Sequence, residues 1–361
     1  MSEPALRALE PERLAELTLE LVAVPSVTGE EAELAELVEA RCRTFAGAQV
    51  ERLGNAVVVR TGPPGATAVA LVGHLDTVPP WPEHRAYREG LRVVGRGSAD
   101  MKGGDAAIIA VLEHAAARGL PVVGIFYDRE EGLAHLNGLR AVLRDSRLIG
   151  TPSFAFVGEP TSCTVHAGCV GSVNADITFH GRTGHAARPW EGENAIIRAA
   201  PFLTRAAAVQ STPVIVDGLE FHDTLTVTTA AGGSARNVVP DRLVLGVNAR
   251  FAPSRSADDA RARIERLVAG EGTVEFLDEA PAASPNLENE TLRAFLAATG
   301  VEVRPKQAWT DVATLQALGI PAVNYGPGEP TQAHQPGEWV DGAAVAEVAR
   351  RLVGFLERWG S

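Results

Sequence analysis

The residues of this sequence that could carry out chemistry are histidines and carboxylates in the short segments GHLDTVP, GRGSADMKGG, DREEG, GEPT and AHQPGEW. From these segments we take His74, Asp76, Asp100, Glu130, Glu131, Glu159 and His334 as the candidate residues. Imidazole nitrogen combined with carboxylate oxygen, without thiolate, suits zinc or a neighbouring divalent metal at a catalytic site. The pattern therefore predicts a metal centre that performs chemistry rather than one that only holds the fold together.

The number of candidate ligands matches two metal ions. A carboxylate such as Asp100 can bridge two ions about 3.5–4 Å apart, while each ion takes one histidine and one glutamate and keeps a position for water. One carboxylate, Glu130, is then not needed as a ligand, and beside a metal ligand it can act as a general base. Asp76, two residues after His74, is placed to hold that imidazole in one tautomer.

Each of these motifs alone has an ordinary structural interpretation. A single histidine is more often structural than a ligand, and we give that interpretation to six of the nine histidines: His84, His114, His135, His166, His180 and His222. Adjacent acids such as Glu130 and Glu131 occur in solvated turns, and Glu159 before Pro160 could be a loop carboxylate. The groups occur together in this order, beside glycines where strands meet loops, and this combination favours the metal site.

Alternating strand and helix patterns predict an α/β layer that would bring these segments together. The first half of the chain reads as strand 68–72, helix 106–118, strand 122–127 and strand 153–157, which predicts a largely parallel sheet. The groups around His74, Glu130 and Glu159 fall just beyond the carboxyl ends of predicted strands, where open α/β sheets place their binding crevice. Residues far apart in the sequence are therefore expected to converge.

A different pattern follows in the middle of the chain. Its order is βαββαβ, a ferredoxin-like unit that can stand as an inserted domain, with the elements at 172–179, 194–210, 225–230, 243–251, 257–269 and 273–277. Beyond the proline-rich stretch 280–285, the apolar runs 313–318 and 322–325 and a helix over 343–359 indicate a return to the first domain. We expect a catalytic domain formed by 1–170 and 281–361, and an inserted domain over 171–280.

Composition narrows the classes of partner. The net charge of −12 disfavours nucleic acid and anionic membranes as binding partners. The sequence contains no run of eighteen or more apolar residues, which a membrane-spanning helix would need. The N-terminal segment is charged throughout and lacks the apolar core of a signal peptide, so we expect a cytoplasmic enzyme. The three cysteines, Cys42, Cys163 and Cys169, have no CxxC spacing and predict neither a disulfide framework nor a thiolate site.

On these motifs the sequence resembles the M20 family of metallohydrolases over nearly its whole length. The resemblance implies two Zn²⁺ ions per chain, with Co²⁺ as a possible substitute. It also implies the role of each ligand: His74 and Glu159 on one ion, Glu131 and His334 on the other, Asp100 as the bridge, Glu130 as the base and Asp76 behind His74. The inserted unit resembles the family's lid and dimerisation domain, which implies a homodimer.

Within that family, the stretches FYDREEG, HAGCVGS, GHAARPWEGENAI, RNVVPD and NARFAPSRS are most similar to the actinobacterial type of succinyl-diaminopimelate desuccinylase. This implies a small anionic N-acyl amino-acid substrate, bound by Asn237 and Arg250 of the lid. His185 matches the lid histidine that the family contributes across the dimer to the neighbouring active site. Val170 stands where the proteobacterial desuccinylases are expected to have an arginine, which predicts a different arrangement for carboxylate recognition.

Other functions fit the same residues. The chain could be another M20 deacylase or peptidase, such as an acetylornithine deacetylase, a carrier-protein-linked lysine or ornithine hydrolase, an aminoacylase or a dipeptidase. From a different class, it could be a non-catalytic metal-binding protein that kept the fold. The presence of Glu130 argues against the last alternative, because a protein that only binds metal needs no base beside it.

Overall fold

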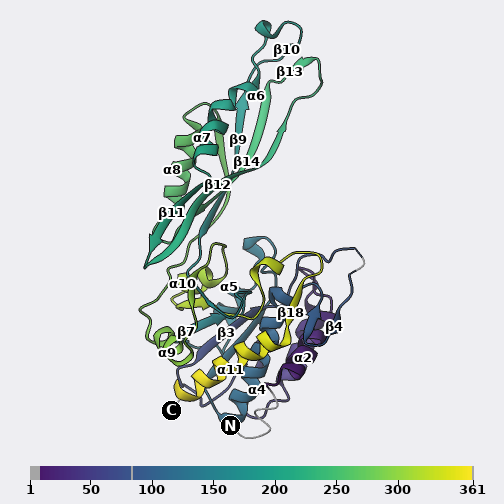
Figure 1. Ribbon diagram of the computed structural model, residues 1–361, viewed down its shortest axis with the longest axis vertical. Coiled ribbons are helices and arrows are strands. Elements are labelled where there is room, and N and C mark those ends of the chain that lie inside the picture. The colour runs from purple at the N-terminus through teal and green to yellow at the C-terminus, as the bar shows by residue number, and fades with distance from the viewer. Residues whose placement is uncertain (1–8, 83, 360–361) are drawn as a thin grey trace. The chain divides into compact units, whose positions relative to one another are not determined.

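The computed structural model describes residues 9–82 and 84–359. The first eight residues, which begin the segment predicted to lack a signal core, lie outside the described residues. The chain forms two compact units (Figure 1). Unit 1 consists of Met1–Ala167, Asn286–Arg304 and Thr314–Ser361, and unit 2 of Gly168–Pro285 and Pro305–Ala313.

Unit 1 is built on a mixed eight-stranded sheet. Its strands in spatial order are β1 (Gln49–Leu53), β2 (Ala56–Arg60), β6 (Val122–Tyr127), β3 (Val69–His74), β7 (Phe154–Val157), β17 (Ala322–Asn324), β8 (Val165–Ala167) and β16 (Val303–Pro305). The central strands β6, β3, β7 and β17 run parallel to one another. This confirms the predicted α/β class with a largely parallel sheet.

The central strands are apolar along their whole length because both faces of the sheet are covered. Every residue of β3 and of β6 is buried, which is the usual pattern for parallel strands between layers of helices. A separate small sheet consists of β18 (Trp339–Asp341), β5 (Arg92–Val94) and β4 (Tyr87–Glu89). It joins two segments of unit 1 that lie more than 200 residues apart in the sequence.

The helices of unit 1 are α2 (Pro11–Ala23), α3 (Ala32–Cys42), α4 (Gly103–Arg118), α5 (Leu139–Asp145), α9 (Glu290–Thr299) and α11 (Gly342–Trp359), and α10 (Val312–Ala317) begins at its boundary with unit 2. Helix α4 packs on β3 and β6, and α11 packs on α2, α4 and α9. Helix α4 ends at Gly119, whose φ of 67° is the left-handed conformation of a glycine cap. None of the helices described here is long and apolar enough to cross a membrane.

Unit 2 is a five-stranded antiparallel sheet with helices on one face. In spatial order its strands are β11 (Ser211–Val216), β12 (Leu219–Gly232), β14 (Arg242–Phe251), β9 (Gly171–His180) and β15 (Thr273–Ala280). Its helices are α6 (Ala195–Arg198), α7 (Ala200–Ala208) and α8 (Ala257–Val268). They share an apolar core with alternate residues of the strands, which includes Phe179 and Leu245 from the strands and Phe202 and Ile264 from the helices. A separate two-stranded ribbon pairs β10 (Gly184–His185) with β13 (Val238–Val239).

The order β12-β14-β9-β15 with two covering helical segments is the predicted ferredoxin-like arrangement. Two details differ from the prediction. The expected helix 194–210 is divided into α6 and α7, and β11 adds an edge strand that contains Pro213. Proline is tolerated at a sheet edge, but it weakens the strand signal in the sequence.

The segment Pro305–Ala313 belongs to unit 2, whereas the sequence pattern assigned all of 281–361 to the first domain. Side-chain contacts explain the difference. Gln307 forms two hydrogen bonds with the main chain of His222. Its side chain accepts from the His222 N–H at 3.0 Å and donates to the His222 main-chain oxygen at 2.8 Å. The thiol of Cys169 lies 3.8 Å from the oxygen of Thr310. These contacts join residues far apart in the sequence, so local patterns do not reveal them.

Candidate metal centre

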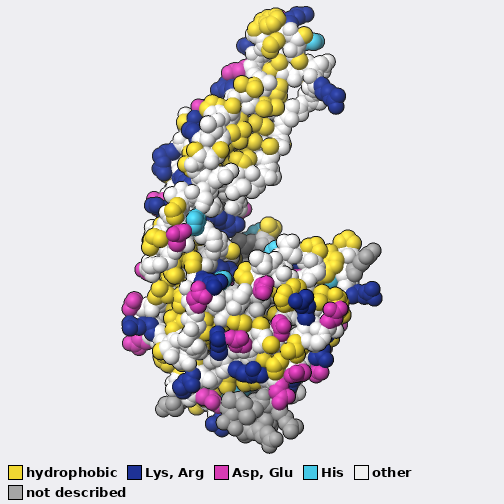
Figure 2. Space-filling view, viewed as in Figure 1, with side chains coloured by type: hydrophobic (Ala, Val, Ile, Leu, Met, Phe, Trp, Pro, Cys, Tyr) yellow, Lys and Arg dark blue, Asp and Glu magenta, His cyan; other side chains and the backbone are white. Residues whose placement is uncertain are grey.

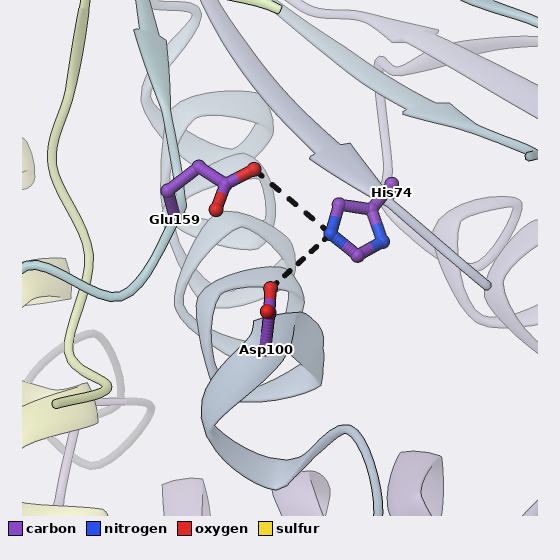
Figure 3. Close-up of side chains that lie close together, drawn as sticks. All are labelled: His74, Asp100 and Glu159. Atoms are coloured by element: carbon purple, nitrogen blue, oxygen red, sulfur yellow. Dashed lines mark ion pairs between the residues drawn. The ribbon is translucent and has the colours of Figure 1, made fainter. Parts of the chain in front are cut away.

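His74 is the last residue of β3 and is almost fully buried. Its Nδ1 lies 3.0 Å from the main-chain oxygen of Asp76, so in the neutral ring Nδ1 donates and Nε2 presents a lone pair. Nε2 lies 3.4 Å from Asp100 Oδ1 and 3.9 Å from Glu159 Oε1 (Figure 3). Among the described residues this buried nitrogen has no hydrogen-bond partner. Such an atom, facing two carboxylates, fits a metal ligand.

A second group of candidate ligands shares Asp100. Its Oδ2 lies 3.5 Å from His334 Nε2, which in turn lies 2.8 Å from Glu131 Oε1. Asp100 lies in η1 (Ser98–Lys102), the irregular turn directly before α4, and the Asp100–Met101 peptide bond is cis. The two oxygens of the Asp100 carboxylate face two different histidines, because Oδ1 lies 3.4 Å from His74 Nε2 and Oδ2 lies 3.5 Å from His334 Nε2. This is the donor arrangement that a carboxylate bridging two divalent ions requires.

The turn that carries Glu130 and Glu131 is held by the carboxylate of Asp76. Asp76 Oδ1 accepts from the Glu130 N–H at 2.9 Å, and Oδ2 accepts from the Glu131 N–H at 3.0 Å and from the Thr28 hydroxyl at 2.9 Å. The sequence predicted that this side chain orients His74. In the structure the main-chain oxygen of Asp76 makes the closer contact with the ring, while its carboxylate lies 3.6 Å from Nδ1. Asp76 thus fixes both the imidazole and the acidic turn.

Two further residues, Arg96 and Glu338, support the centre. They lie within the motifs GRGSADMKGG and AHQPGEW, but the sequence analysis gave neither of them a role. Glu338 is fully buried and accepts from the main-chain N–H groups of Ala99 and Asp100, each at 3.0 Å. Arg96 donates to Glu338 at 2.9 Å and to the main-chain oxygen of His334 at 3.3 Å. This buried pair connects the segment of Asp100 with that of His334. An acid 238 residues from Asp100 in the sequence gives no local signal of such a contact.

The glycines beside the ligands permit close packing of the strand ends against α4. A Cβ added to Gly73 would collide with the Asp105 carboxylate, and one added to Gly104 would collide with the main-chain oxygen of Gly158. Gly73 precedes His74, and Gly158 precedes Glu159. The glycines in these motifs therefore let β3 and β7 bring their ligands close to the segment of Asp100.

The acidic surroundings favour protonated histidines when no metal is bound. Burial tends to lower the pKa of His74, but the adjacent Asp100 carboxylate and the charges of Glu130, Asp76 and Glu159 together raise it well above its usual value. Contacts with Asp100 and Glu131 raise the pKa of His334 to about 10. Burial opposes ionisation of Asp100, but the two histidines hold its pKa below the usual range. Both imidazoles must therefore release a proton before they bind metal.

Because of this proton release, the zinc affinity of the metal-free protein should increase with pH. We expect each site to bind about tenfold more tightly per pH unit between about pH 7 and pH 8.5, since one proton leaves for each ion bound. Competition titrations against a chromogenic chelator at several pH values measure this slope. An affinity that stays constant above about pH 7 would contradict the prediction, because histidines of ordinary pKa are already neutral there.

The predicted residues of the inserted domain lie in unit 2. His185 is exposed in β10, and its Nδ1 accepts from the Ala187 N–H at 3.0 Å. In the neutral ring Nε2 then carries the proton and is an available donor. Asn237 is exposed, and its main-chain oxygen accepts from the Ala186 N–H at 2.9 Å. Arg250 lies on β14, and its Nε donates to Asn248 Oδ1 at 2.9 Å.

Several histidines that the sequence analysis interpreted as structural have ordinary structural contacts. His84 Nε2 accepts from the Arg96 N–H at 2.8 Å, and His114 Nε2 lies 3.0 Å from a Glu357 carboxylate oxygen. His222 Nδ1 lies 2.7 Å from the Ser211 hydroxyl. Each of these contacts occupies one ring nitrogen of the histidine.

Comparison with known proteins agrees with the geometry. Residues 70–358 match the sequence model of the family described as Peptidase family M20/M25/M40. The chain belongs to peptidase family M20. It is a metallohydrolase of that family, and three groups of its histidines and carboxylates could hold a metal ion: His74, Asp100 and Glu159; His74, Glu130 and Glu131; and Asp100, Glu131 and His334.

Relatives within family M20 include two actinobacterial proteins. A Mycobacterium tuberculosis protein named "Putative succinyl-diaminopimelate desuccinylase DapE" is 38% identical, covering 94% of this chain and 97% of its own length. Succinyl-diaminopimelate desuccinylase of Corynebacterium glutamicum is 34% identical, covering 94% of this chain and 95% of its own length. The structure of Bacillus subtilis YXEP, described as a dinuclear metal-binding peptidase from the M20 family, shares the fold with a TM-score of 0.71 at 17% identity. This match covers 98% of this chain and 99% of that one.

Proposed function

We propose that this chain is a dinuclear zinc amidohydrolase that converts N-succinyl-L,L-diaminopimelate to succinate and L,L-diaminopimelate. The observation that carries the reaction class is the position of Asp100, whose two oxygens face His74 Nε2 and His334 Nε2. The substrate is supported by the two actinobacterial relatives, whose names specify a desuccinylase. We infer Zn²⁺, with Co²⁺ as a substitute, because imidazole and carboxylate donors suit these ions.

In this proposal His74 and Glu159 hold one ion, Glu131 and His334 hold the other, and Asp100 bridges them. When bound, the ions lower the pKa of a water molecule and polarise the amide carbonyl. One carboxylate oxygen of Glu130 lies within 4.8 Å of ligand atoms of both His74 and Glu131. This position supports the proposal that Glu130 accepts a proton from the attacking water and returns it to the departing amine.

We also propose a homodimer formed through unit 2, in which His185 donates a hydrogen bond to the carbonyl oxygen as negative charge develops there. The tautomer imposed by Ala187 supports this role, because it leaves Nε2–H as the donor. Ile196 and Ile197 of α6 and Leu203 of α7 are exposed, and Figure 2 shows hydrophobic side chains gathered around α6. Such an apolar surface fits a partner subunit.

A panel of N-acyl substrates tests the proposed specificity. We expect kcat/KM of the zinc-loaded enzyme to be about 10- to 100-fold higher for N-succinyl-L,L-diaminopimelate than for N-acetylornithine, since a charge-assisted contact with the succinyl carboxylate is lost in the acetyl compound. Equal or higher kcat/KM on N-acetylornithine would reject the desuccinylase assignment in favour of another M20 deacylase. The amidohydrolase assignment would stand in that case. A lack of turnover on the whole panel would favour the non-catalytic alternative.

Mixing two inactive variants tests whether His185 serves the partner subunit. We expect Glu130→Ala and His185→Ala to regain roughly a quarter of wild-type activity after joint dissociation and reassembly, because half of randomly formed dimers are mixed and each has one complete site. Reassembled homodimers of each variant serve as controls. If His185 acted within its own chain, every site would still lack one residue. No recovery in metal-loaded mixed dimers would therefore reject the shared site.

A further inference from the structure

The sheet of unit 2 has a polar face opposite its helices. Ala249 and Phe251 of β14 belong to the apolar core beneath the helices, so Asn248 and Arg250 project from the other face. A row of hydrogen bonds crosses three strands on that face. Asp278 accepts from Asn174 at 2.7 Å, Asn174 accepts from Asn248 at 2.7 Å, and Asn248 accepts from Arg250 Nε at 2.9 Å.

This row fixes the Arg250 guanidinium through its Nε and leaves its outer nitrogens available. Within the described part of the chain, neither Nη1 nor Nη2 of Arg250 makes a hydrogen bond or an ion pair. Burial lowers the pKa of Arg250, and the Asp278 charge opposes this effect. A planar fork whose two outer donors are free and whose orientation is fixed is suited to bind a carboxylate in bidentate fashion.

A second cation, Lys306, lies in the segment of unit 2 that the contacts of Gln307 and Thr310 attach to this sheet. Gln307 is hydrogen-bonded to the main chain of His222. His222 lies two residues before Thr224, which pairs with Arg250 across β12 and β14. Cys169 contacts Thr310 and lies three residues before Ser172, the β9 neighbour of Arg250. Both attachments therefore place the segment beside the strand positions that flank Arg250.

Lys306 is only 8% exposed. No hydrogen bond or ion pair of its ammonium group occurs among the described residues. The charge of Lys306 nevertheless reaches Cys169, where it opposes the effect of burial, which raises the thiol pKa to about 11. When ionised, the same Cys169 side chain acts on Arg250, where its charge opposes the lowering of the pKa by burial. Both cations therefore act on one small region of unit 2.

The lysine content of the chain makes this residue unusual. Of 33 basic residues, only Lys102 and Lys306 are lysines. Lys102 is buried, but its Nζ donates to the main-chain oxygens of Leu21 and Val24 at 3.2 and 2.7 Å. A largely buried cation is stabilised by an anionic partner. The described residues give the Lys306 ammonium group no such partner, and its Nζ is not among their fully buried polar atoms, so a bound anion can reach it.

We propose that Arg250 and Lys306 form one recognition site for a ligand with at least two carboxylates, each cation binding a different carboxylate. This inference rests on the proposed function and extends it, because it makes Lys306 a specificity-determining residue. Val170 stands where the proteobacterial desuccinylases are expected to have an arginine. In this chain Lys306, from a distant segment, supplies the second positive charge on the same unit.

Binding measurements in the metal-loaded Glu130→Gln variant test the proposal without turnover. We expect Lys306→Gln, added to that background, to weaken binding of N-succinyl-L,L-diaminopimelate by about 10- to 100-fold, as for loss of a charge-assisted hydrogen bond. Lys306→Arg keeps the charge and should restore most of the affinity. Calorimetric titration gives each Kd, and Arg250→Gln serves as the matched variant of the other cation.

Substrate analogues identify the carboxylate that each cation binds. The substrate has three carboxylates, and three analogues each replace one of them with a carboxamide. For one analogue the effect of Lys306→Gln should vanish, and for a different analogue the effect of Arg250→Gln should vanish. Equal losses on every analogue, or an unchanged Kd for the full substrate in Lys306→Gln, would overturn the inference. If instead the substrate fails to bind the Glu130→Gln variant, the proposed function itself is wrong.

A spectroscopic measurement keeps Lys306 in place and so does not depend on how a Lys306 variant folds. Lysine labelled with ¹³C at Cε should give two signals from this chain, and Lys306→Arg removes one of them, which assigns both. We expect saturating substrate to shift the Lys306 signal in the Glu130→Gln variant and to leave the Lys102 signal in place. A Lys306 signal that does not move at saturation would also overturn the proposal.

Discussion

Replacing Glu130 with glutamine is expected to leave both metal sites filled and to lower kcat by about 10²- to 10⁴-fold, the usual contribution of a positioned general base. The amide keeps the size of the side chain, and the main-chain N–H of residue 130 still donates to Asp76. The turn should therefore keep its shape while the residue loses its ability to accept a proton. Steady-state kinetics and elemental analysis of the same preparation measure both results.

Glu131→Gln is the matched control, because it changes the neighbouring acid in the same way. Its carboxylate lies 2.8 Å from His334 Nε2 and belongs to the second ligand group. We expect this variant to lose metal affinity first, with activity partly restored by excess zinc. If Glu130→Gln loses metal and Glu131→Gln keeps it, the base and the ligand have been assigned to the wrong members of the pair.

Removal of metal should abolish activity, and zinc should restore it at two ions per chain. The reason is the sharing of Asp100, which lies near His74 and Glu159 on one side and near Glu131 and His334 on the other. Elemental analysis after dialysis against chelator and then against zinc gives the stoichiometry. Saturation at one ion per chain, with full activity, would mean that Asp100 is a ligand of a single site.

Asp100→Asn separates the bridge from the other ligands. An amide offers one oxygen and no negative charge, so it cannot serve two cations as a carboxylate does. We expect this variant to bind at most one ion tightly and to lose nearly all activity, while Glu338 still accepts from the main-chain N–H of residue 100. Two tightly bound ions in Asp100→Asn would contradict the bridging role.

The fold could be predicted well where its signal is local. The buried strands β3 and β6 are short continuous apolar runs, and helix α4 ends at a glycine in the left-handed conformation. The edge strand β11 and the assignment of 305–313 to unit 2 were not predicted. Both depend on contacts between distant segments, to which hydrophobic periodicity is insensitive.

For the candidate site, the sequence by itself determined which donor types are present, in what order, and that several of them follow strand ends. Those are local properties, because a donor atom and a strand end are both specified by neighbouring residues. Only the tertiary structure decided that the Asp76 carboxylate holds the turn of Glu130 and Glu131, and that Arg96 and Glu338 connect Asp100 with His334. The tertiary structure also decided that the side chain of Lys306 is largely buried and that its ammonium group makes no hydrogen bond or ion pair among the described residues. Such pairings depend on packing between segments up to 242 residues apart, where a side chain's neighbours are set by the folded chain and not by its own surrounding sequence.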